Sequence, residues 1–312
     1  MNAHLLRLLT AVGLAVGVSA SAPQPSAAPA HDQCAVIPHD CGFPDALSVG
    51  VPGWMTLQNV PSQVSSGPGW YYDPRGWVEV DGNGAVLSGL DIPCSLDISA
   101  SNVTIKDVNV QTSGQSSFGI SLRNTSNVTI ENSDVEGRNT GAGRLMAGIK
   151  DIYGNSTGTS VLDNNISRVA TGVQMDEGLI QNNYIHDMGY IAGDHVNGIT
   201  VGGGTTPVTI QHNTILVDEG QTDAISLFQD TGAEANKVIK DNLLAGGGYA
   251  IYGGEKTGGK AARNIVIEGN RISTIYYPAG GQWGPIVYFT PGLGNVWSGN
   301  VWDSTGLVIT SP

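Results

Sequence analysis

The residues best suited to chemistry lie in the middle of the chain, between positions 141 and 230. Asp194 and His195 are adjacent, a further carboxyl group follows at Asp223, and a cation precedes them at Lys150. Imidazole and carboxylate groups transfer protons, and an ammonium group neutralises an anionic substrate. We therefore predict that the catalytic residues are His195, Asp194, Asp223 and Lys150.

These residues are accompanied by side chains that suit the binding of a polar ligand. Aromatic rings stack on apolar faces, while amide, carboxylate and guanidinium groups bond to hydroxyl or carboxylate groups. Singly, each such side chain is also common in turns and at solvated surfaces. Their concentration in consecutive segments nevertheless indicates a functional surface. The predicted substrate-binding residues are Arg144, Gln174, Asp176, Asn197, Tyr252 and Trp283.

Two columns of apolar residues repeat through the chain and must position these side chains. The first column is Ile120, Ile149, Val173, Ile199, Ile225, Ile251 and Ile286. The second is Ile105, Ile130, Val161, Ile180, Ile210, Ile239, Ile267 and Trp297. From Val161 onward, the position three residues after the second column is always asparagine, at Asn164, Asn183, Asn213, Asn242, Asn270 and Asn300. Two columns that stay in step indicate a structural repeat.

The repeat predicts an all-β fold, a right-handed parallel β-helix of about nine coils. Its segments are short, they alternate apolar and polar residues, and Gly, Asn, Asp and Thr separate them without any helical periodicity. Stacked coils place equivalent residues about 4.8 Å apart, so the asparagines should form a hydrogen-bonded ladder. The aromatic cluster at residues 70–77 should cap the first coil, and the alternative is a platform for stacking sugars.

The neighbours of the first column predict where a groove would lie. If the column points inward, alternation sends its neighbours outward. The preceding neighbours are Gly119, Gly148, Gly172, Gly198, Ala224, Ala250 and Pro285. The following neighbours are Ser121, Lys150, Gln174, Thr200, Ser226, Tyr252 and Val287. Small residues beside a polar row predict a smooth floor on which a long ligand lies. The alternative is that Gly and Ala ease strand entry or packing.

The ends of the sequence predict the domain organisation. Residues 1–22 read as a secretory signal peptide with a short apolar run, and residues 23–33 read as a Pro/Ala-rich linker. Residues 34–76 form an N-terminal arm and cap, and residues 77–312 form the β-helix. We expect a secreted, extracellular monomer that does not span or bind a membrane.

Composition and cysteine content narrow the class of partner. The chain of 312 residues contains 44 Gly, only 13% charged residues and a net charge of −13. This charge disfavours nucleic acid and anionic membranes as partners. An exported chain with three cysteines can form one internal disulfide. Cys34 and Cys41 are favoured by their proximity, and the alternative is that one of them pairs with Cys94.

The repeat motifs resemble those of a known group of proteins. Asn197-Gly198-Ile199, Asp223-Ala224-Ile225 and the Ile-x-x-Asn-x-Ile pattern are similar to the repeats of secreted right-handed parallel β-helix proteins of the pectate-lyase-like superfamily. The resemblance covers residues 77–302, and it implies a polysaccharide substrate that is cleaved by a lyase or a hydrolase. Of the motifs that polygalacturonases carry, only Asp223 has a counterpart here.

Three functions follow for such a surface. β-Elimination from a uronide is slightly favoured, with Lys150 or Arg144 neutralising the carboxylate and His195, beside Asp194, or Tyr252 acting as base. Ca²⁺ held by Asp side chains would help an acidic protein to bind a polyuronate, although the sequence specifies no metal ligands. Hydrolysis by the carboxyl groups of Asp176 and Asp223 is the first alternative. A glycan-binding or surface β-helix without turnover is the second.

Overall fold

The computed structural model describes residues 33–310, except for the side chains of Gln33, Gln115 and Ser116. The predicted signal peptide and all but the last residue of the predicted linker lie outside these described residues. Within them, almost every regular element is a β-strand. The only helices in the described part are α1 (Gln33–Val36) and the 3₁₀ helix η1 (Pro38–Cys41).

The strands form three sheets, which we call A, B and C. Sheet A contains β1 (Gln58–Asn59), β6 (Leu90–Ile92), β9 (Asn109–Thr112), β12 (Asp134–Gly137), β15 (Asn165–Ser167), β18 (Tyr184–His186), β21 (Thr214–Val217), β24 (Leu243–Gly246), β27 (Arg271–Ser273) and β30 (Val301–Trp302). Sheet B contains β2 (Ser66–Gly67), β3 (Trp70–Asp73), β4 (Trp77–Val80), β7 (Ser95–Ile98), β10 (Gly114–Leu122), β13 (Leu145–Asp151), β16 (Val169–Gln174), β19 (Val196–Val201), β22 (Thr222–Leu227), β25 (Tyr249–Gly253) and β28 (Gly284–Val287). Sheet C contains β5 (Val86–Ser88), β8 (Thr104–Lys106), β11 (Thr129–Glu131), β14 (Ser160–Leu162), β17 (Gly178–Gln181), β20 (Val208–Gln211), β23 (Ala235–Lys240), β26 (Arg263–Glu268) and β29 (Val296–Ser298).

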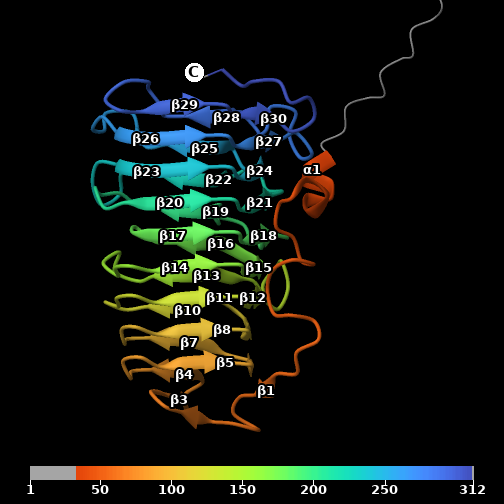
Figure 1. Cartoon of the computed structure of the whole chain (residues 1–312), viewed down its shortest axis with the longest axis vertical. Helices are drawn as coiled ribbons and strands as arrows, with labels where there is room; N and C mark the ends of the chain where they lie inside the picture. Colours follow the sequence, from red (N-terminus) through yellow and green to blue (C-terminus); the bar gives the residue numbers. More distant parts are fainter. Residues whose placement is uncertain (1–32, 311–312) are drawn as a thin grey trace, which may run out of the picture. The chain divides into compact units, whose positions relative to one another are not determined.

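Each coil passes through sheet B, then sheet C, then sheet A, and the next coil pairs in parallel on top of it. The coils run from β4, β5 and β6 to β28, β29 and β30, which makes about nine. Figure 1 shows them stacked in sequence order and wound in a right-handed sense. The predicted right-handed parallel β-helix is therefore confirmed.

The two apolar columns found in the sequence are inward-facing ladders. The first column pairs residue by residue through sheet B, and the second does so through sheet C. Sheet A supplies a third buried ladder, which includes Val135, Ile166, Ile185 and Ile215. Because stacked coils repeat the same apolar residue at the same place, one continuous hydrophobic core fills the helix.

The predicted asparagine ladder is also confirmed. All six members, from Asn164 to Asn300, are fully buried. In each of the first five, the backbone amide and the side-chain Nδ2 both donate to Oδ1 of the asparagine on the next coil, at 2.9 to 3.0 Å. The ladder satisfies backbone and side-chain groups at a buried turn, where unpaired polar atoms would be costly.

The N-terminal arm lies along sheet A. Cys34 and Cys41 form the disulfide, and Cys94 is a buried free thiol, so the alternative pairing with Cys94 is wrong. Cys34 and Ala35 pack on outward-facing residues of β21 and β24, and β1 pairs with β6 at the other end of the arm. Figure 1 shows the arm running from α1 back to β1 beside this sheet. The outer face of sheet A is therefore partly covered by the chain itself.

The aromatic cluster at residues 70–77 belongs to an antiparallel hairpin of β3 and β4. Trp70 is buried in the core and Tyr72 packs against it, whereas Tyr71 is exposed. The guanidinium of Arg75 lies 4.3 Å from the ring centroid of Trp77. Since only two of the aromatic rings contact the core, the cap that was expected from the whole cluster is not confirmed.

In the described part of the chain, no helix combines the length and the apolar character that crossing a bilayer requires.

Candidate functional site

The candidate site is a groove along a crease in sheet B, by which we mean the line where its strands bend. Two columns of outward-facing residues, three positions apart, follow the crease from coil to coil. The upstream column is Ala147, Thr171, Asn197, Asp223 and Tyr249. The downstream column is Lys150, Gln174, Thr200, Ser226 and Tyr252. The first three members of each column line the same clefts, so the strands bend between them and the columns face each other there.

The small residues between the columns do not form the floor of the groove, which corrects the sequence prediction. A Cβ atom added to Gly148, Gly172 or Gly198 would lie 2.8, 2.8 or 2.2 Å from Cγ2 of the facing isoleucine in sheet A. Ala224 and Ala250, in the same column, are fully buried in the core. Simple alternation fails here because two consecutive residues face inward at the bend. The alternative interpretation, that small residues serve packing, is correct.

The groove holds two adjoining clefts. One has a volume of about 470 Å³ and is lined by Thr171, Gln174, His195, Asn197, Thr200, Thr222, Phe228 and Asp230. The other has a volume of about 290 Å³, and its walls include Phe118, Ala147, Lys150 and Asp194. Four residues, Thr171, Gln174, His195 and Asn197, line both clefts, so a ligand can extend from one into the other across several coils.

Lys150 is the cation of this groove. Its Nζ donates a hydrogen bond to Oε1 of Gln174 and lies 5.4 Å from the ring centroid of Phe118. Burial lowers the pKa of Lys150, while the nearby carboxylates of Asp151 and Asp176 oppose this change. Two of the residues predicted from the sequence, Lys150 and Gln174, are thus brought together on adjacent strands.

His195 is exposed at the rim of the groove, immediately before β19. Its Nδ1 lies 3.2 Å from Oγ1 of Thr222 and 3.2 Å from Nε2 of Gln221. His195 and Lys150 line the same cleft. An imidazole and an ammonium group therefore border one space, as the sequence predicted.

Arg144 and Asp194, for which substrate binding and catalysis were predicted, pair with each other beside the groove, and Asp194 also lines the smaller cleft. Arg144 is only 1% exposed, and its guanidinium pairs with both carboxylate oxygens of Asp194. One of these oxygens also accepts the backbone amide of Ile191 at 2.9 Å. This pair joins positions 50 residues apart. It fixes the turn that presents His195, and it leaves Arg144 no surface with which to contact a ligand.

Asp223 is buried under the groove surface. The residue is 0% exposed, and neither carboxylate oxygen accepts a well-formed hydrogen bond. Burial raises the pKa of Asp223 well above its usual range, and the nearby Ser226 hydroxyl opposes this change. On the adjacent strand, Oδ1 of Asn197 also lacks a partner, while its Nδ2 donates to the carbonyl of His195 at 3.2 Å. The two side chains leave three unpaired oxygens beside the cleft.

Asp176 lies at the other end of the strands, in a smaller hollow of about 170 Å³ that it shares with Tyr153 and Asp230. Its Oδ1 accepts the backbone amide of Gly202 at 2.6 Å, and burial raises its pKa. In register, Asp176 is five positions beyond the column of Asp223, or about 16 Å of strand. Two carboxyl groups that flank a glycosidic bond lie within about 10 Å of each other, so this geometry disfavours the predicted hydrolytic pair.

Aromatic residues continue the groove beyond the cleft. Tyr252 and Trp283 were predicted from the sequence, whereas Tyr249 and Phe228 were not. The ring of Tyr252 lies 5.4 Å from Phe228 and 5.7 Å from Tyr249, and Tyr249 lies 6.1 Å from Trp283. Tyr249 could have been found as the residue two positions before Ile251 in the repeat, because Thr171 and Asn197, at the equivalent position on other coils, line the cleft. Phe228 follows the end of β22 and carries no such signal.

The buried ion pair of Glu234 and Lys237 was not identified from the sequence. Glu234 and Lys237 are both 0% exposed, and Lys237 donates to the carbonyls of Gly204 and Thr206 at 3.2 and 2.5 Å. Burial raises the pKa of Glu234 to about 8. The spacing of these residues resembles an ordinary surface pair, so the sequence offers no sign that the loops before β20 and β23 enclose them.

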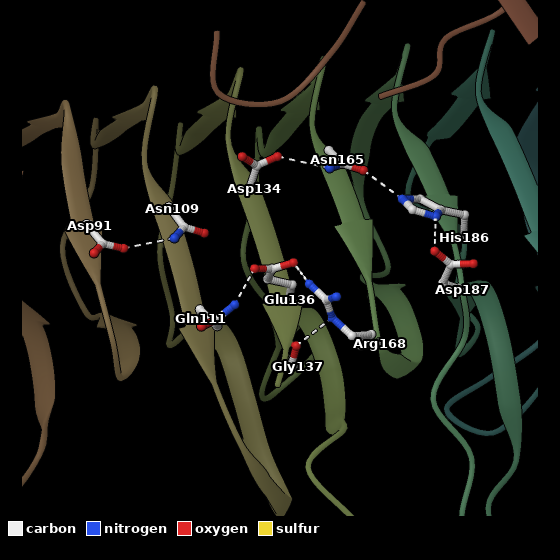
Figure 2. A network of polar contacts seen from close by, with 10 residues as sticks. All are labelled: Asp91, Asn109, Gln111, Asp134, Glu136, Gly137, Asn165, Arg168, His186 and Asp187. Carbon is white, nitrogen blue, oxygen red and sulfur yellow. Dashed lines mark hydrogen bonds and ion pairs between the residues drawn. The ribbon is translucent and has the colours of Figure 1, made fainter. Parts of the chain in front are cut away.

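A second polar cluster lies on sheet A, and the N-terminal arm contacts part of it. Figure 2 shows the network, in which Asn165 donates to Asp134 at 3.0 Å and lies 2.9 Å from His186. Gly50 of the arm packs against Asp134 and Asn165. Burial lowers the pKa of His186 and raises that of Asp134. These contacts stabilise the strand stack and hold the arm, so we place the candidate site on sheet B.

No family model matches the chain, and no curated protein matches it. Among solved structures, the crystal structure of pectate lyase Pel9A is similar, with a TM-score of 0.41 and 15% sequence identity over 75% of this chain and 57% of that one. This chain thus spans somewhat more than half the length of that protein.

Among residues 33–310, no group of three or more His, Cys, Asp or Glu side chains is placed to hold a metal ion. The architecture is a parallel β-helix, which is the fold that the resemblance to the pectate-lyase-like superfamily implied.

Proposed function

We propose that this protein is a secreted β-helix protein that binds a polysaccharide in the sheet B groove and cleaves it by β-elimination. The observation that carries the proposal is that Lys150 and His195 border the same cleft. Elimination from a uronide needs a cation for the carboxylate and a base for the C5 proton, and these two side chains supply them. Export rests on the sequence of residues 1–22.

Each of the two residues has a defined part in the reaction. The ammonium group of Lys150 pairs with the uronate carboxylate, which makes the C5 proton more acidic. His195 accepts that proton at Nε2 when its Nδ1 carries the hydrogen and donates it to the Thr222 hydroxyl. The electrons form the C4–C5 double bond as the bond from C4 to the glycosidic oxygen breaks, and solvent protonates the leaving oxygen. Arg144 and Asp194 hold the His195 turn in place.

The assay that tests the proposal uses the purified full chain with a panel of uronate-containing and neutral polysaccharides. New ultraviolet absorbance from an unsaturated uronide supports elimination, whereas new reducing ends without that absorbance indicate hydrolysis. Binding without either product indicates a glycan-binding protein without turnover and refutes the proposal.

Two variants assign the roles. His195→Ala should lower the rate by about 10² to 10⁴, and Lys150→Met should raise KM for the uronate substrate as well as lower kcat. Lys240→Met is the matched control, because Lys240 lies on β23 in sheet C, away from the groove. Parent-like cleavage by both groove variants would place the reaction elsewhere.

A further inference from the structure

The groove does not end at the cleft but continues over the next two coils as an aromatic surface. Phe228 lines the larger cleft and contacts Tyr252 edge to face. Tyr249 and Tyr252 occupy the upstream and downstream columns on β25, so they flank the same crease one coil further on. The ring centroid of Tyr249 lies 6.1 Å from that of Trp283.

Trp283 is held as a platform with one face open. A Cβ atom added to Gly248 would lie 2.6 Å from the indole ring, which shows that the ring packs against the backbone there. The amide of Trp283 donates to the carbonyl of Gly248 at 2.7 Å, which fixes the position of the residue. The residue nevertheless remains 58% exposed. An immobilised aromatic ring with an open face can stack on an apolar ligand face at little entropic cost.

Unpaired polar atoms lie between the cleft and this platform. Both oxygens of Asp223 and Oδ1 of Asn197 are buried without hydrogen-bond partners. Asp223 pairs in register with Asn197 on one side and Tyr249 on the other, so it belongs to the same outward column. Leaving buried polar atoms unpaired is costly. A ligand whose hydroxyl groups reach these atoms would satisfy them, which for the fully buried Asp223 requires neighbouring side chains to move.

We infer that the coils of β22, β25 and β28 form a subsite for a neutral sugar ring, with Trp283 and Tyr252 stacking on the ring and Asp223 and Asn197 bonding to its hydroxyl groups. The inference rests on the proposed function and names its substrate class. The substrate is a heteropolysaccharide in which a uronate is joined to an uncharged sugar.

The distribution of charge separates this class from a homopolymer of uronates. Lys150 borders the cleft. The residues that make up the proposed subsite, namely Asn197, Asp223, Phe228, Tyr249, Tyr252 and Trp283, include no cation. A second carboxylate placed on them would meet no opposite charge and would be repelled by a chain of net charge −13. A neutral sugar with one apolar face and several hydroxyl groups suits both the rings and the unpaired oxygens.

Binding and cleavage are measured separately, so that the subsite and the proposed function can fail independently. The full chain is titrated with cellotetraose, galactotetraose, mannotetraose and tetragalacturonate, and tryptophan fluorescence and calorimetry report binding. At least one neutral tetrasaccharide should bind. Trp283→Ala should weaken that binding about tenfold. Tyr252→Ala should weaken it as well, whereas Lys240→Met, on β23 in sheet C, should leave it unchanged.

Trp54→Ala is the matched control, because Trp54 is 82% exposed and lies on the N-terminal arm. Thermal unfolding of each variant confirms that it is folded before its affinity is compared. The subsite is refuted if none of the neutral probes binds, or if Trp283→Ala binds them as tightly as the parent. Binding of a neutral probe by a protein that cleaves no uronide would support the subsite and refute the proposed elimination. Cleavage of a polyuronate by a protein that binds no neutral probe would do the reverse.

Discussion

Gly198 on β19 lies so close to Ile215 on β21 that a methyl group at Gly198 would stand 2.2 Å from Cγ2 of that isoleucine. The contact joins sheet B to sheet A through the interior of the coil. It explains why small residues recur at this position, because only they let sheet B bend inward far enough to form a groove outside. A feature of the core thus shapes the functional surface.

Gly198→Ala should therefore destabilise the protein by about 1 to 3 kcal/mol, because the added methyl group overpacks the core and also meets the carbonyl of Ala224 at 2.4 Å. Urea denaturation measures the change. Gly53→Ala is the control, since nothing lies within 4 Å of an added Cβ there. Equal stability of the Gly198→Ala variant and the control would show that the core accommodates the added methyl group and would contradict the prediction.

Asn213→Leu should destabilise the protein by about 1 to 3 kcal/mol. The substitution removes the bonds from Nδ2 to Asn242 at 3.0 Å and to the carbonyl of Ile180 at 3.1 Å, and it leaves the amide of Asn183 without its acceptor. Thermal and chemical denaturation both report this loss. Ser298→Leu, on an exposed position of β29, is the control and should have little effect. A stable Asn213→Leu protein would mean that the ladder does not contribute to stability.

Asp194→Ala should destabilise the protein by about 3 to 5 kcal/mol, because it removes the carboxylate that pairs with the buried guanidinium of Arg144. The double variant Arg144→Met with Asp194→Leu should recover part of the loss, since no buried charge then remains. Asp81→Ala, at an exposed position, is the control for loss of a carboxylate. If the double variant is less stable than Asp194→Ala alone, the pair is not the origin of the effect.

The rate of cleavage should decline at alkaline pH, and this decline should occur at a lower pH than for a lysine with an ordinary pKa. The proposed reaction needs Lys150 in its charged form, and burial lowers the pKa of Lys150. The rate therefore falls as pH rises through that lowered pKa. Lys150→Arg should move the decline to higher pH, since a guanidinium group keeps its charge to a much higher pH than an ammonium group. A pH–rate profile with the same alkaline limb in both proteins would exclude Lys150 as the group responsible.

The free energy of unfolding should fall as pH rises above the ordinary pKa of an aspartic acid, in part because of Asp223. Its pKa is raised in the folded state, so the folded protein keeps a proton that the unfolded chain has released. Stability from this group is fully present below the unfolded pKa and is lost as pH rises toward the folded pKa. Asp223→Asn should therefore become more stable relative to the parent as pH rises above the unfolded pKa of about 4. Glu234, whose pKa is raised to about 8, acts in the same direction but is present in both proteins. Parallel curves of Tm against pH would contradict the assignment to Asp223.

The sequence by itself determined the repeating coil and most of the strand positions that line the groove. Because each coil stacks on the last, a residue such as Ile199 must meet its equivalents above and below, and this requirement is visible as a repeat. Asn213 was predictable for the same reason, since its bonds run between equivalent positions. Lys150 and Gln174 follow inward residues of the same column, so their meeting on the outer face was predictable as well.

Tertiary structure decided the features that do not repeat from coil to coil. Strict alternation placed Gly198 outside, whereas the bend in sheet B turns it inward. Arg144 and Asp194 meet across 50 residues through a turn that has no equivalent in other coils. The burial of Asp223 depends on the folded surroundings of its carboxyl group, which its own motif does not reveal. A repeat records which residues stack, because stacking selects the same residue type on every coil. It does not record local bends, single long-range pairs or the loss of solvent around one carboxyl group, because each of these occurs only where the folded chain brings distant segments together.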